Sequence, residues 1–155
     1  LDKDMFSTIA ELRVPYVLMH MKGTPQNMQN KENTIYNNIS NDVFTFFSNK
    51  IKELNSLGIK DIIIDPGFGF AKTTEQNFEL LRNLSNFCTF EIPILVGMSR
   101  KTMLWKSLNT NPENCLNATT VVNTMALMNG ARILRVHDVK EAVETVKLFQ
   151  KYNNL

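Results

Sequence analysis

Hydrophobic positions along the chain alternate between two spacings, one typical of strands and the other typical of helices. Short apolar runs, of which Ile62–Ile64 is the clearest, predict strands that are covered on both faces in a parallel sheet. Between these runs, apolar residues recur every three or four positions, as in amphipathic helices. The predicted order is the end of a helix followed by four strand–helix units, and the strand-to-strand spacings of roughly 30 to 45 residues suit right-handed βαβ crossovers.

The predicted elements follow from these spacings and from local breakers. Strands are predicted at Val14–His20, Asp61–Asp65, Ile94–Val96 and Ile133–Val136. Helices are predicted at Met5–Arg13, at Ile35–Leu57 before Gly58, after Thr73 through Leu84, after Asn111–Pro112 up to Gly130, and after Asp138. Thr73 with Gln76, and Asp138 with Glu141, have the spacing of N-terminal caps, so these two starts are the best defined.

Four strand–helix units are half of an eight-unit barrel or most of a small open doubly wound sheet. At 155 residues the chain is long enough for one domain with a sizeable core, and no linker or change of composition divides it. We therefore expect a single α/β domain over residues 1–155. The chain opens directly on helix-like sequence at Leu1, which predicts a piece of a longer protein.

Composition excludes several classes of partner. The net charge of +2 without a dense basic run argues against a nucleic-acid partner. The apolar runs are too short to span a bilayer, and no signal peptide pattern opens the chain, so no membrane partner is expected. Cys88 and Cys115 lie far apart without Cys-x-x-Cys spacing, which predicts two free thiols in a reducing cytosol.

Polar residues gather where the predicted strands end. They are His20 and Lys22, then Asp65, then Ser99, Arg100 and Lys101, and finally Arg135, His137 and Asp138. Because the carboxyl ends of parallel strands share one face of a sheet, we expect these side chains to converge on one cleft.

The segment Asp65–Phe70 combines a carboxylate with a proline, two glycines and two aromatic residues. Pro66 cannot donate to a strand ladder, so the strand should end near Asp65. The two glycines allow a sharp turn and close packing. On this segment alone, Asp65 fits a ligand-binding carboxylate and a turn or helix cap about equally.

An arginine in a buried strand indicates an anionic partner, because an unpaired buried charge costs several kcal/mol. Arg135 lies in such a predicted strand, and its partner is either Asp65 or a ligand. In barrels the loops after the last two strands often bind phosphate. Those loops supply Ser99, Arg100, Arg135 and His137, so the sequence predicts an anion site there.

Several of these residues have a structural interpretation as well as a functional one. His20 is more typical of a buried, hydrogen-bonded histidine than of a catalyst, and Lys22 is typical of a solvated loop lysine. Lys101 could open a helix, but a cation is disfavoured near a helix N-terminus, which favours a function. Met19, Phe68 and Phe70 are more typical of a hydrophobic core than of a cofactor site. Phe68 and Phe70, however, flank a loop glycine, Gly69.

Three segments together resemble signature segments of dihydropteroate synthase, the folate-pathway enzyme inhibited by sulfonamides. They are Asp65–Phe70, Gly97–Lys101 and Arg135–Asp138, in order and at suitable spacing, and Leu18–Met21 resembles the family's fifth strand. One segment alone would be a weak signal, but the three together are specific. The resemblance covers essentially the whole chain.

The resemblance implies a TIM (β/α)8 barrel of which this chain is the C-terminal half, strands five to eight. The family joins 6-hydroxymethyl-7,8-dihydropterin pyrophosphate to p-aminobenzoate, giving 7,8-dihydropteroate and pyrophosphate, a transfer of the EC 2.5.1 type. It also implies a cytoplasmic homodimer that associates through its last helices, with the segment Asn114–Met128 as a candidate contact surface.

The resemblance implies three catalytic residues among a larger substrate-binding set. Asp65 would hydrogen-bond the pterin ring, Lys101 would lie over the pterin and contact both substrates, and Arg135 would stack on the pterin. Arg135 would also hold the pyrophosphate with His137, assisted by Ser99. The set is completed by Phe70 in the p-aminobenzoate pocket, by Thr102 where relatives often have serine for the p-aminobenzoate carboxylate, and by Gly97 and Met19.

The family barrel needs roughly 250 residues, so its first half lies outside this sequence. That half carries the magnesium-binding asparagine, a second pterin aspartate and two mobile lids. The resemblance therefore implies Mg²⁺ that acts through the substrate pyrophosphate, with no metal ligand in this chain, and we expect the chain to be inactive alone. A half barrel leaves strand edges unpaired, which predicts self-association or a partner half.

Two alternatives stay open. One is another pterin-binding barrel, such as a methyltetrahydrofolate:corrinoid methyltransferase, which lacks the pyrophosphate-binding pairing seen in Ser99–Lys101 and Arg135–His137. The other is a half barrel that serves only as a folding or interaction module.

Overall fold

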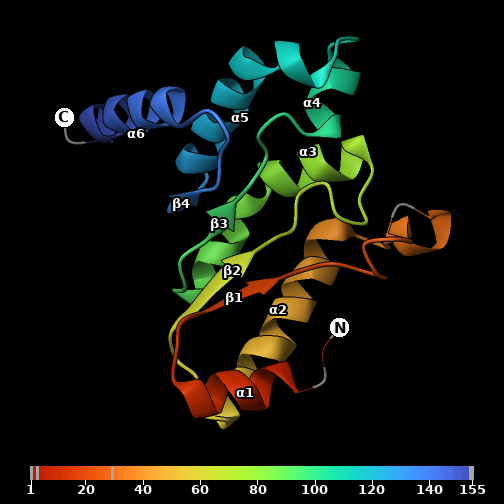
Figure 1. Cartoon of the computed structure of the whole chain (residues 1–155), viewed down its shortest axis with the longest axis vertical. Coiled ribbons are helices and arrows are strands. Elements are labelled where there is room, and N and C mark those ends of the chain that lie inside the picture. Colours follow the sequence, from red (N-terminus) through yellow and green to blue (C-terminus); the bar gives the residue numbers. More distant parts are fainter. Residues whose placement is uncertain (1, 3, 29, 154–155) are drawn as a thin grey trace.

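The computed structural model describes residues 2, 4–28 and 30–153, which form alternating strands and helices (Figure 1). The strands are β1 (Tyr16–Met19), β2 (Ile62–Asp65), β3 (Leu95–Val96) and β4 (Ile133–Leu134). The α-helices are α1 (Met5–Leu12), α2 (Ile39–Ser56), α3 (Thr74–Arg82), α4 (Thr102–Ser107), α5 (Leu116–Met128) and α6 (Val139–Asn153). Short 3-10 helices are η1 (Lys31–Thr34), η2 (Leu84–Phe90) and η3 (Pro112–Asn114).

The four strands are parallel and follow one another in sequence order. β1 pairs with β2, placing Met19 opposite Asp65, and β3 pairs with β4. A parallel bridge between Ile64 and Ile94 joins the two pairs. Doubly wound sheets reverse their strand order at a switch point, whereas barrel strands run consecutively. The order β1-β2-β3-β4 is therefore that of a partial barrel, as predicted.

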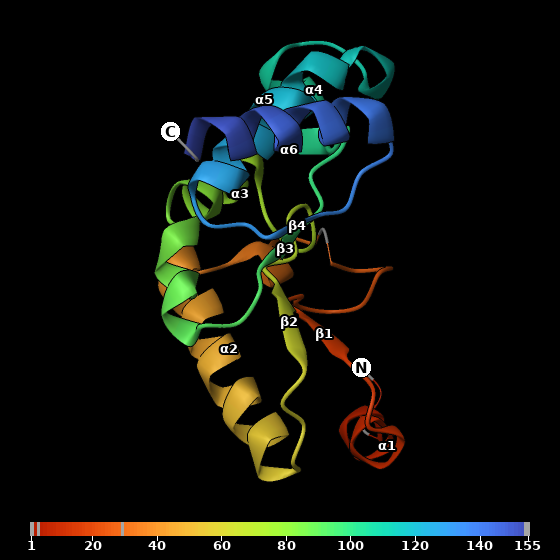
Figure 2. The same ribbon diagram turned by 90° about the vertical axis from the view of Figure 1, so that its left-hand side faces the viewer.

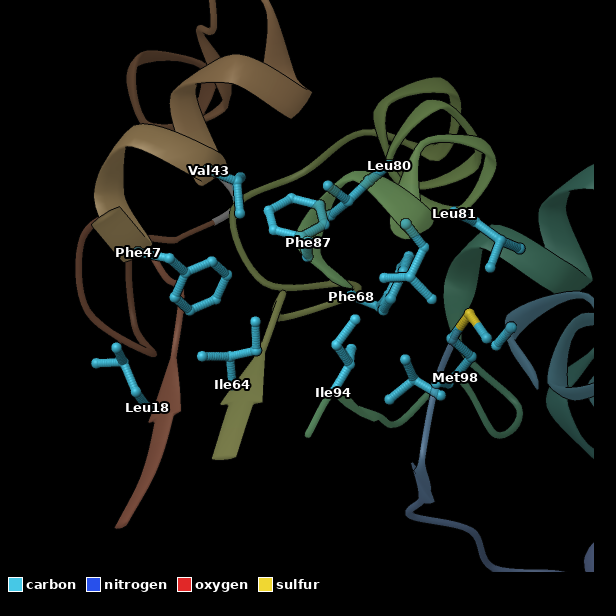
Figure 3. Packing of buried hydrophobic residues seen from close by; sticks show 14 of the residues in the cluster. Leu18, Val43, Phe47, Ile64, Phe68, Leu80, Leu81, Phe87, Ile94 and Met98 are labelled. Atoms are coloured by element: carbon cyan, nitrogen blue, oxygen red, sulfur yellow. The ribbon is translucent and has the colours of Figure 1, made fainter. Parts of the chain in front are cut away.

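One face of the strands carries the core. Leu18 of β1, Ile64 of β2 and Ile94, which directly precedes β3, point toward the same side (Figure 3). They meet buried side chains of α2, α3 and η2: Val43, Phe47, Leu80, Leu84 and Phe87. The helices α2 and α3 lie on this side of β1 and β2 (Figure 2). Burial of these large apolar side chains fixes each strand in register, because a one-residue slip would turn them to the opposite face.

The opposite face is open within the part of the chain that the structure describes. Val17 is 44% exposed, and Ile63, which lies beside it in the ladder, is partly exposed. The expectation that Ile62–Ile64 is covered on both faces is therefore wrong for Ile63. The physical reason is that four strands curve without closing, so the side chains that point away from the helices meet no second layer.

Several element boundaries differ from the sequence-based ones. The second helix begins at Ile39 and not at Ile35, because Asn38 caps it by accepting a 2.9 Å hydrogen bond from the Asn41 N–H. Ile35 instead follows η1 and is 67% exposed. The outer strands are shorter than predicted: β1 lacks the ends of Val14–His20, and β4 stops before Arg135.

The predicted cap at Thr73 is confirmed, whereas the limits of the helices near it and near Asn111 differ from the prediction. Thr73 and Gln76 form the predicted capping box, with bonds of 3.3 and 2.9 Å between each side chain and the other's N–H. The helix that follows ends at Arg82, so Leu84 belongs to η2. Asn111 caps η3 rather than a long helix, α5 begins only at Leu116, and the short helix α4 was not predicted.

The two cysteines are free thiols, as predicted: Cys88 is exposed and Cys115 is buried. None of the helices in residues 4–28 and 30–153 combines the length and the apolarity that a membrane crossing requires.

Candidate functional site

The loop that follows β2 is shaped by its two glycines. This loop, residues 66–71, is called the phenylalanine loop below. Gly67 has φ +70°, and its N–H donates a 2.8 Å hydrogen bond to Oδ1 of Asp65. A Cβ atom at Gly67 would lie 2.0 Å from the backbone oxygen of His20, so no other residue fits there. The loop is thereby pressed against the end of β1 and orients the Asp65 carboxylate.

Asp65 ends β2 as a buried carboxylate, only 6% exposed. Burial raises its pKa, while the Gly67 N–H and the charges of Lys101, Arg135 and Lys72 act in the opposite direction. Three cations therefore surround one carboxylate. The structure brings Asp65, Lys101 and Arg135 together at the carboxyl ends of β2, β3 and β4, where the sequence places them.

Lys101 is the N-cap residue of α4, and its side chain reaches back across the phenylalanine loop. Its Nζ donates to the backbone oxygen of Phe68 and lies 4.5 Å from the centre of the Phe70 ring. Burial lowers the pKa of Lys101 to about 8, Asp65 opposes this shift and Arg135 adds to it. A Cβ atom at Gly69 would lie 2.9 Å from Cδ of Lys101, so the second loop glycine makes room for this lysine.

Lys72 is a further residue of the site that the sequence reasoning missed. It is 4% exposed, and its Nζ lies 3.0 Å from three groups: His20 Nδ1, Gly67 O and Phe70 O. Burial lowers its pKa to about 7, with Asp65 opposing the shift. A signal was available, since Lys72 directly precedes the helix cap Thr73, where cations are disfavoured. The same argument had singled out Lys101.

Arg135 lines a small recess of about 30 Å³, called the Arg135 recess below, together with Gly97, Ser99, Lys101 and His137. Ser99 is buried, and its Oγ accepts a hydrogen bond of 3.4 Å from the His137 N–H. Arg135 and His137 are exposed. The expectation of a buried Arg135 was wrong, because β4 ends at Leu134 and the face beside it is open.

Arg100 does not belong to this recess. Its guanidinium donates two hydrogen bonds, of 2.6 and 3.0 Å, to the Asp138 carboxylate and binds the backbone oxygens of Pro112 and Glu113. Its own N–H donates to Oγ1 of Thr119, 3.1 Å away. The prediction that Arg100 contributes to an anion site is therefore wrong. Asp138, which the sequence predicted as a helix cap, holds Arg100 away from the recess.

The remaining predicted substrate-binding residues lie in two places. Met19 is partly buried at the end of β1, opposite Asp65 in the ladder. Phe70 is partly exposed beside Lys101, whereas Phe68 turns into the core. Thr102 is exposed and faces a separate groove of about 400 Å³ that Gly69, Lys72, Thr73 and Lys106 also line. This groove adjoins the phenylalanine loop.

His20 and Lys22 both have structural partners. His20 is 3% exposed, and burial together with the charge of Lys72 lowers its pKa to about 3, so the ring is neutral at physiological pH. The interpretation of His20 as a buried, bonded histidine is confirmed. Lys22 is not simply solvated: its Nζ donates to Ile35 O at 2.7 Å and lies 3.8 Å from the centre of the Tyr36 ring.

The site as a whole offers one hydrogen-bond acceptor inside a positively charged rim. A carboxylate can accept from a planar heterocycle that presents N–H groups. Lysine and arginine around it can bind phosphate oxygens. Chemically, this arrangement on a partial barrel suits a ligand with a polar ring and an anionic tail.

Comparison with known proteins places the chain in a family. Residues 1–137 match the family described as "Pterin binding enzyme". The chain is 41% identical over 143 residues to the dihydropteroate synthase of Escherichia coli strain K12. This match spans 91% of this chain and 50% of that protein. It is 36% identical over 155 residues to the dihydropteroate synthase of Haemophilus influenzae Rd, a match that spans 99% of this chain and 56% of that protein.

Solved structures agree with the sequence matches. Yersinia pestis dihydropteroate synthase in complex with a sulfonamide drug superposes with a TM-score of 0.92 at 38% identity, over 97% of this chain and 55% of that one. The Xanthomonas albilineans dihydropteroate synthase in complex with 7,8-dihydropteroate superposes with a TM-score of 0.89 at 31% identity, over 99% of this chain and 58% of that one.

The partial barrel and its charged site thus define a ligand-binding α/β protein, and the chain belongs to the family of pterin binding enzymes. The relatives described above are dihydropteroate synthases, which are TIM barrels. The chain spans about half the length of the curated relatives it matches.

Proposed function

We propose that this chain is the C-terminal half, strands five to eight, of a dihydropteroate synthase. The whole protein would condense 6-hydroxymethyl-7,8-dihydropterin pyrophosphate with p-aminobenzoate. The observation that carries the proposal is the cluster of Asp65, Lys101 and Arg135 at the carboxyl ends of three successive strands. The identity to dihydropteroate synthases over nearly the whole chain supports it.

Asp65 would bind the pterin. An ionised carboxylate only accepts hydrogen bonds, which suits the N–H edge of a pterin ring. Its orientation is fixed by the 2.8 Å bond from Gly67 N–H, so little ordering is needed on binding. Met19, opposite Asp65 at the end of β1, would pack against the ring.

The Arg135 recess would receive the pyrophosphate. In the reaction, the bond between the pterin methylene carbon and the pyrophosphate oxygen breaks, and the amine nitrogen of p-aminobenzoate bonds to that carbon and loses a proton. Cations preorganised around the leaving group stabilise the charge that develops on it. Arg135, Lys101 and His137, with the Ser99 hydroxyl, supply this environment. No side-chain nucleophile is required.

The p-aminobenzoate would lie against the phenylalanine loop. The Phe70 ring lies beside the Lys101 ammonium group, which would contact both substrates. Thr102 lines the adjoining groove with Gly69, so its hydroxyl would bind the p-aminobenzoate carboxylate. The threonine methyl group narrows this groove relative to a serine.

Magnesium does not fit the carboxylate of this site. Divalent cations prefer several oxygen ligands, but Asp65 is surrounded by Lys72, Lys101 and Arg135. No group of three or more His, Cys, Asp or Glu residues in the part of the chain that the structure describes could hold a metal ion. A magnesium ion bound to the substrate would therefore take its protein ligand from elsewhere in the whole enzyme.

We further propose a cytoplasmic homodimer that associates through α5 and α6. Large apolar side chains on these helices are exposed: Val121, Met125, Met128, Val143, Leu148 and Tyr152. A groove of about 530 Å³ lies between the two helices. Exposed apolar patches of this kind mark association surfaces. Sedimentation velocity tests the proposal: a monomer at micromolar concentration would contradict it.

Calorimetric titration with 6-hydroxymethyl-7,8-dihydropterin pyrophosphate tests the function. We expect Asp65→Asn and Arg135→Ala each to weaken binding by about tenfold or more, because each removes a charge-assisted contact. Asp61→Asn is the matched control, since Asp61 precedes the same strand at its other end and is exposed. Equal affinity of the wild type and Asp65→Asn would contradict the assignment. Turnover by the 155-residue chain alone would contradict the half-barrel expectation.

A further inference from the structure

Lys72 is the most buried lysine of the site, and its ammonium group is fully used. Its three N–H groups have three partners at 3.0 Å: Gly67 O, Phe70 O and His20 Nδ1. Because an ammonium group only donates, His20 Nδ1 must accept, and the ring proton lies on Nε2. The low pKa of His20, about 3, is in keeping with this neutral form.

These contacts close a ring of hydrogen bonds around Asp65. The His20 N–H donates to the backbone oxygen of Asp65 at 2.9 Å, and the Gly67 N–H donates to its Oδ1 at 2.8 Å. Lys72 closes this ring, since its Nζ contacts both Gly67 O and His20 Nδ1. The ends of β1 and β2 and the phenylalanine loop are thereby tied to one ammonium group.

Lys72 and Lys101 hold the same loop through different atoms. Lys72 binds the backbone oxygens of Gly67 and Phe70, whereas Lys101 binds Phe68 O and lies beside the Phe70 ring. Lys72 is 4% exposed and lies at the edge of the groove beside Thr102, whereas Lys101 lines the Arg135 recess. Lys101 therefore faces the proposed pyrophosphate site, whereas the ammonium group of Lys72 has protein partners for all three of its donors and supports the loop.

We propose that Lys72 is a positioning residue, whose ammonium group fixes the phenylalanine loop so that Asp65 and Lys101 are held in the geometry that binds the pterin. This inference rests on the proposed function of the site, because it names what Lys72 positions. Without the ammonium group, two backbone oxygens and one ring nitrogen lose their buried donor, which is costly. Asp65 also loses one of its three surrounding cations.

The proposal has a pH signature. The charged and titratable groups that face Lys72 are His20 and Lys22 from the end of β1 and the loop after it, Asp65 from β2, and Lys101 before α4. His20 stays neutral above its pKa of about 3. Lys72, with a pKa of about 7, loses a proton and with it its third donor as the pH rises through neutrality. Lys101, with a pKa of about 8, loses its proton at a higher pH.

The first test compares Lys72→Met with Lys52→Met, an exposed lysine on α2 that serves as the matched control. Calorimetry with the dihydropterin pyrophosphate should show about tenfold weaker binding for Lys72→Met and no change for Lys52→Met. Between about pH 6 and pH 9, the affinity of the wild type should fall in two steps and that of Lys72→Met in one. Equal affinities and identical pH profiles of Lys72→Met and the wild type would overturn the proposal.

The second test needs neither ligand nor variant. In ¹H–¹⁵N NMR spectra of the wild type, the amide signals of Gly67 and Phe70 should shift with the same midpoint as the Lys72 side chain. Titration of Lys72 without any movement of these amides would overturn the proposal. If the wild type binds no pterin while the amides do follow Lys72, the proposed function of the chain fails but the positioning role of Lys72 in the loop is supported.

Discussion

The guanidinium group of Arg135 lies against the backbone of Gly97. A Cβ atom built on Gly97 would be 2.9 Å from Nη2, 3.0 Å from Nε and 3.2 Å from Cζ of Arg135. Gly97 directly follows β3, and Arg135 directly follows β4, its partner in the ladder. The missing side chain at position 97 is therefore what lets the arginine lie flat over the end of the sheet.

Gly97→Ala should displace Arg135 while leaving the fold intact. The added methyl group would meet the far end of a flexible, exposed side chain, which can move away at little cost in folding free energy. We expect binding of the pterin pyrophosphate to weaken by about tenfold, as for loss of a charge-assisted contact. Calorimetry in the Arg135→Ala background provides the check, because there the second change should have no further effect.

Gly67→Ala should destabilise the whole chain. The new Cβ would lie 2.0 Å from the backbone oxygen of His20, and φ is +70°, so neither the contact nor the backbone can relax without separating the loop from β1. We expect a loss of more than about 3 kcal/mol in the free energy of unfolding, measured in urea. Gly58→Ala is the matched control: φ is +80° but no atom lies within 4 Å, so only about 1–2 kcal/mol of backbone strain should appear. Similar losses for both would contradict the tight packing at Gly67.

Asp138→Asn should loosen the connection between the loop after β3 and the start of α6. The Asp138 carboxylate accepts two hydrogen bonds from Arg100, and this lowers the pKa of Asp138. Stabilisation by this pair is present above the ordinary pKa of aspartate and is lost as the pH falls through the lowered value.

We expect a lower melting temperature for Asp138→Asn at neutral pH and a smaller difference at high salt, since the pair is partly exposed. Glu141→Gln, in the first turn of the same helix, is the control and should change the melting temperature less. A larger effect at Glu141 would contradict the assignment.

The neutral form of His20 should make stability depend on pH in weak acid. The pKa of His20 is about 3 in the folded protein against 6.5 ordinarily, so the unfolded chain binds the proton first. The stabilisation is therefore complete above about pH 6.5 and is lost as the pH falls toward 3, at up to about 1.4 kcal/mol per pH unit. Urea unfolding at several pH values should show this slope in the wild type and not in His20→Gln. Parallel slopes would contradict it.

Local features of the chain were predictable because short-range chemistry decides them. The strand ends at Asp65 because Pro66 cannot donate, and the bonds within the Thr73–Gln76 capping box involve only neighbouring residues. The order of the strands followed from the spacing of the apolar runs, and the convergence of Asp65, Lys101 and Arg135 followed from that order. For the same reason Ile35 was misplaced, since helical spacing continues past a cap that the Asn38 side chain supplies.

Only the tertiary structure decided which charged side chains face the site. Arg100 and Arg135 were both predicted to contribute to the anion site, yet Asp138 holds the first away from the recess while the absence of a side chain at Gly97 leaves room for the second. Lys72 became a buried support because its partners come from another strand and from the far side of its own loop. The sequence by itself determined the order of the strands and which residues reach the end of the sheet. The partners of each charge were set by packing between segments far apart in the chain, because burial makes every unpaired charge costly.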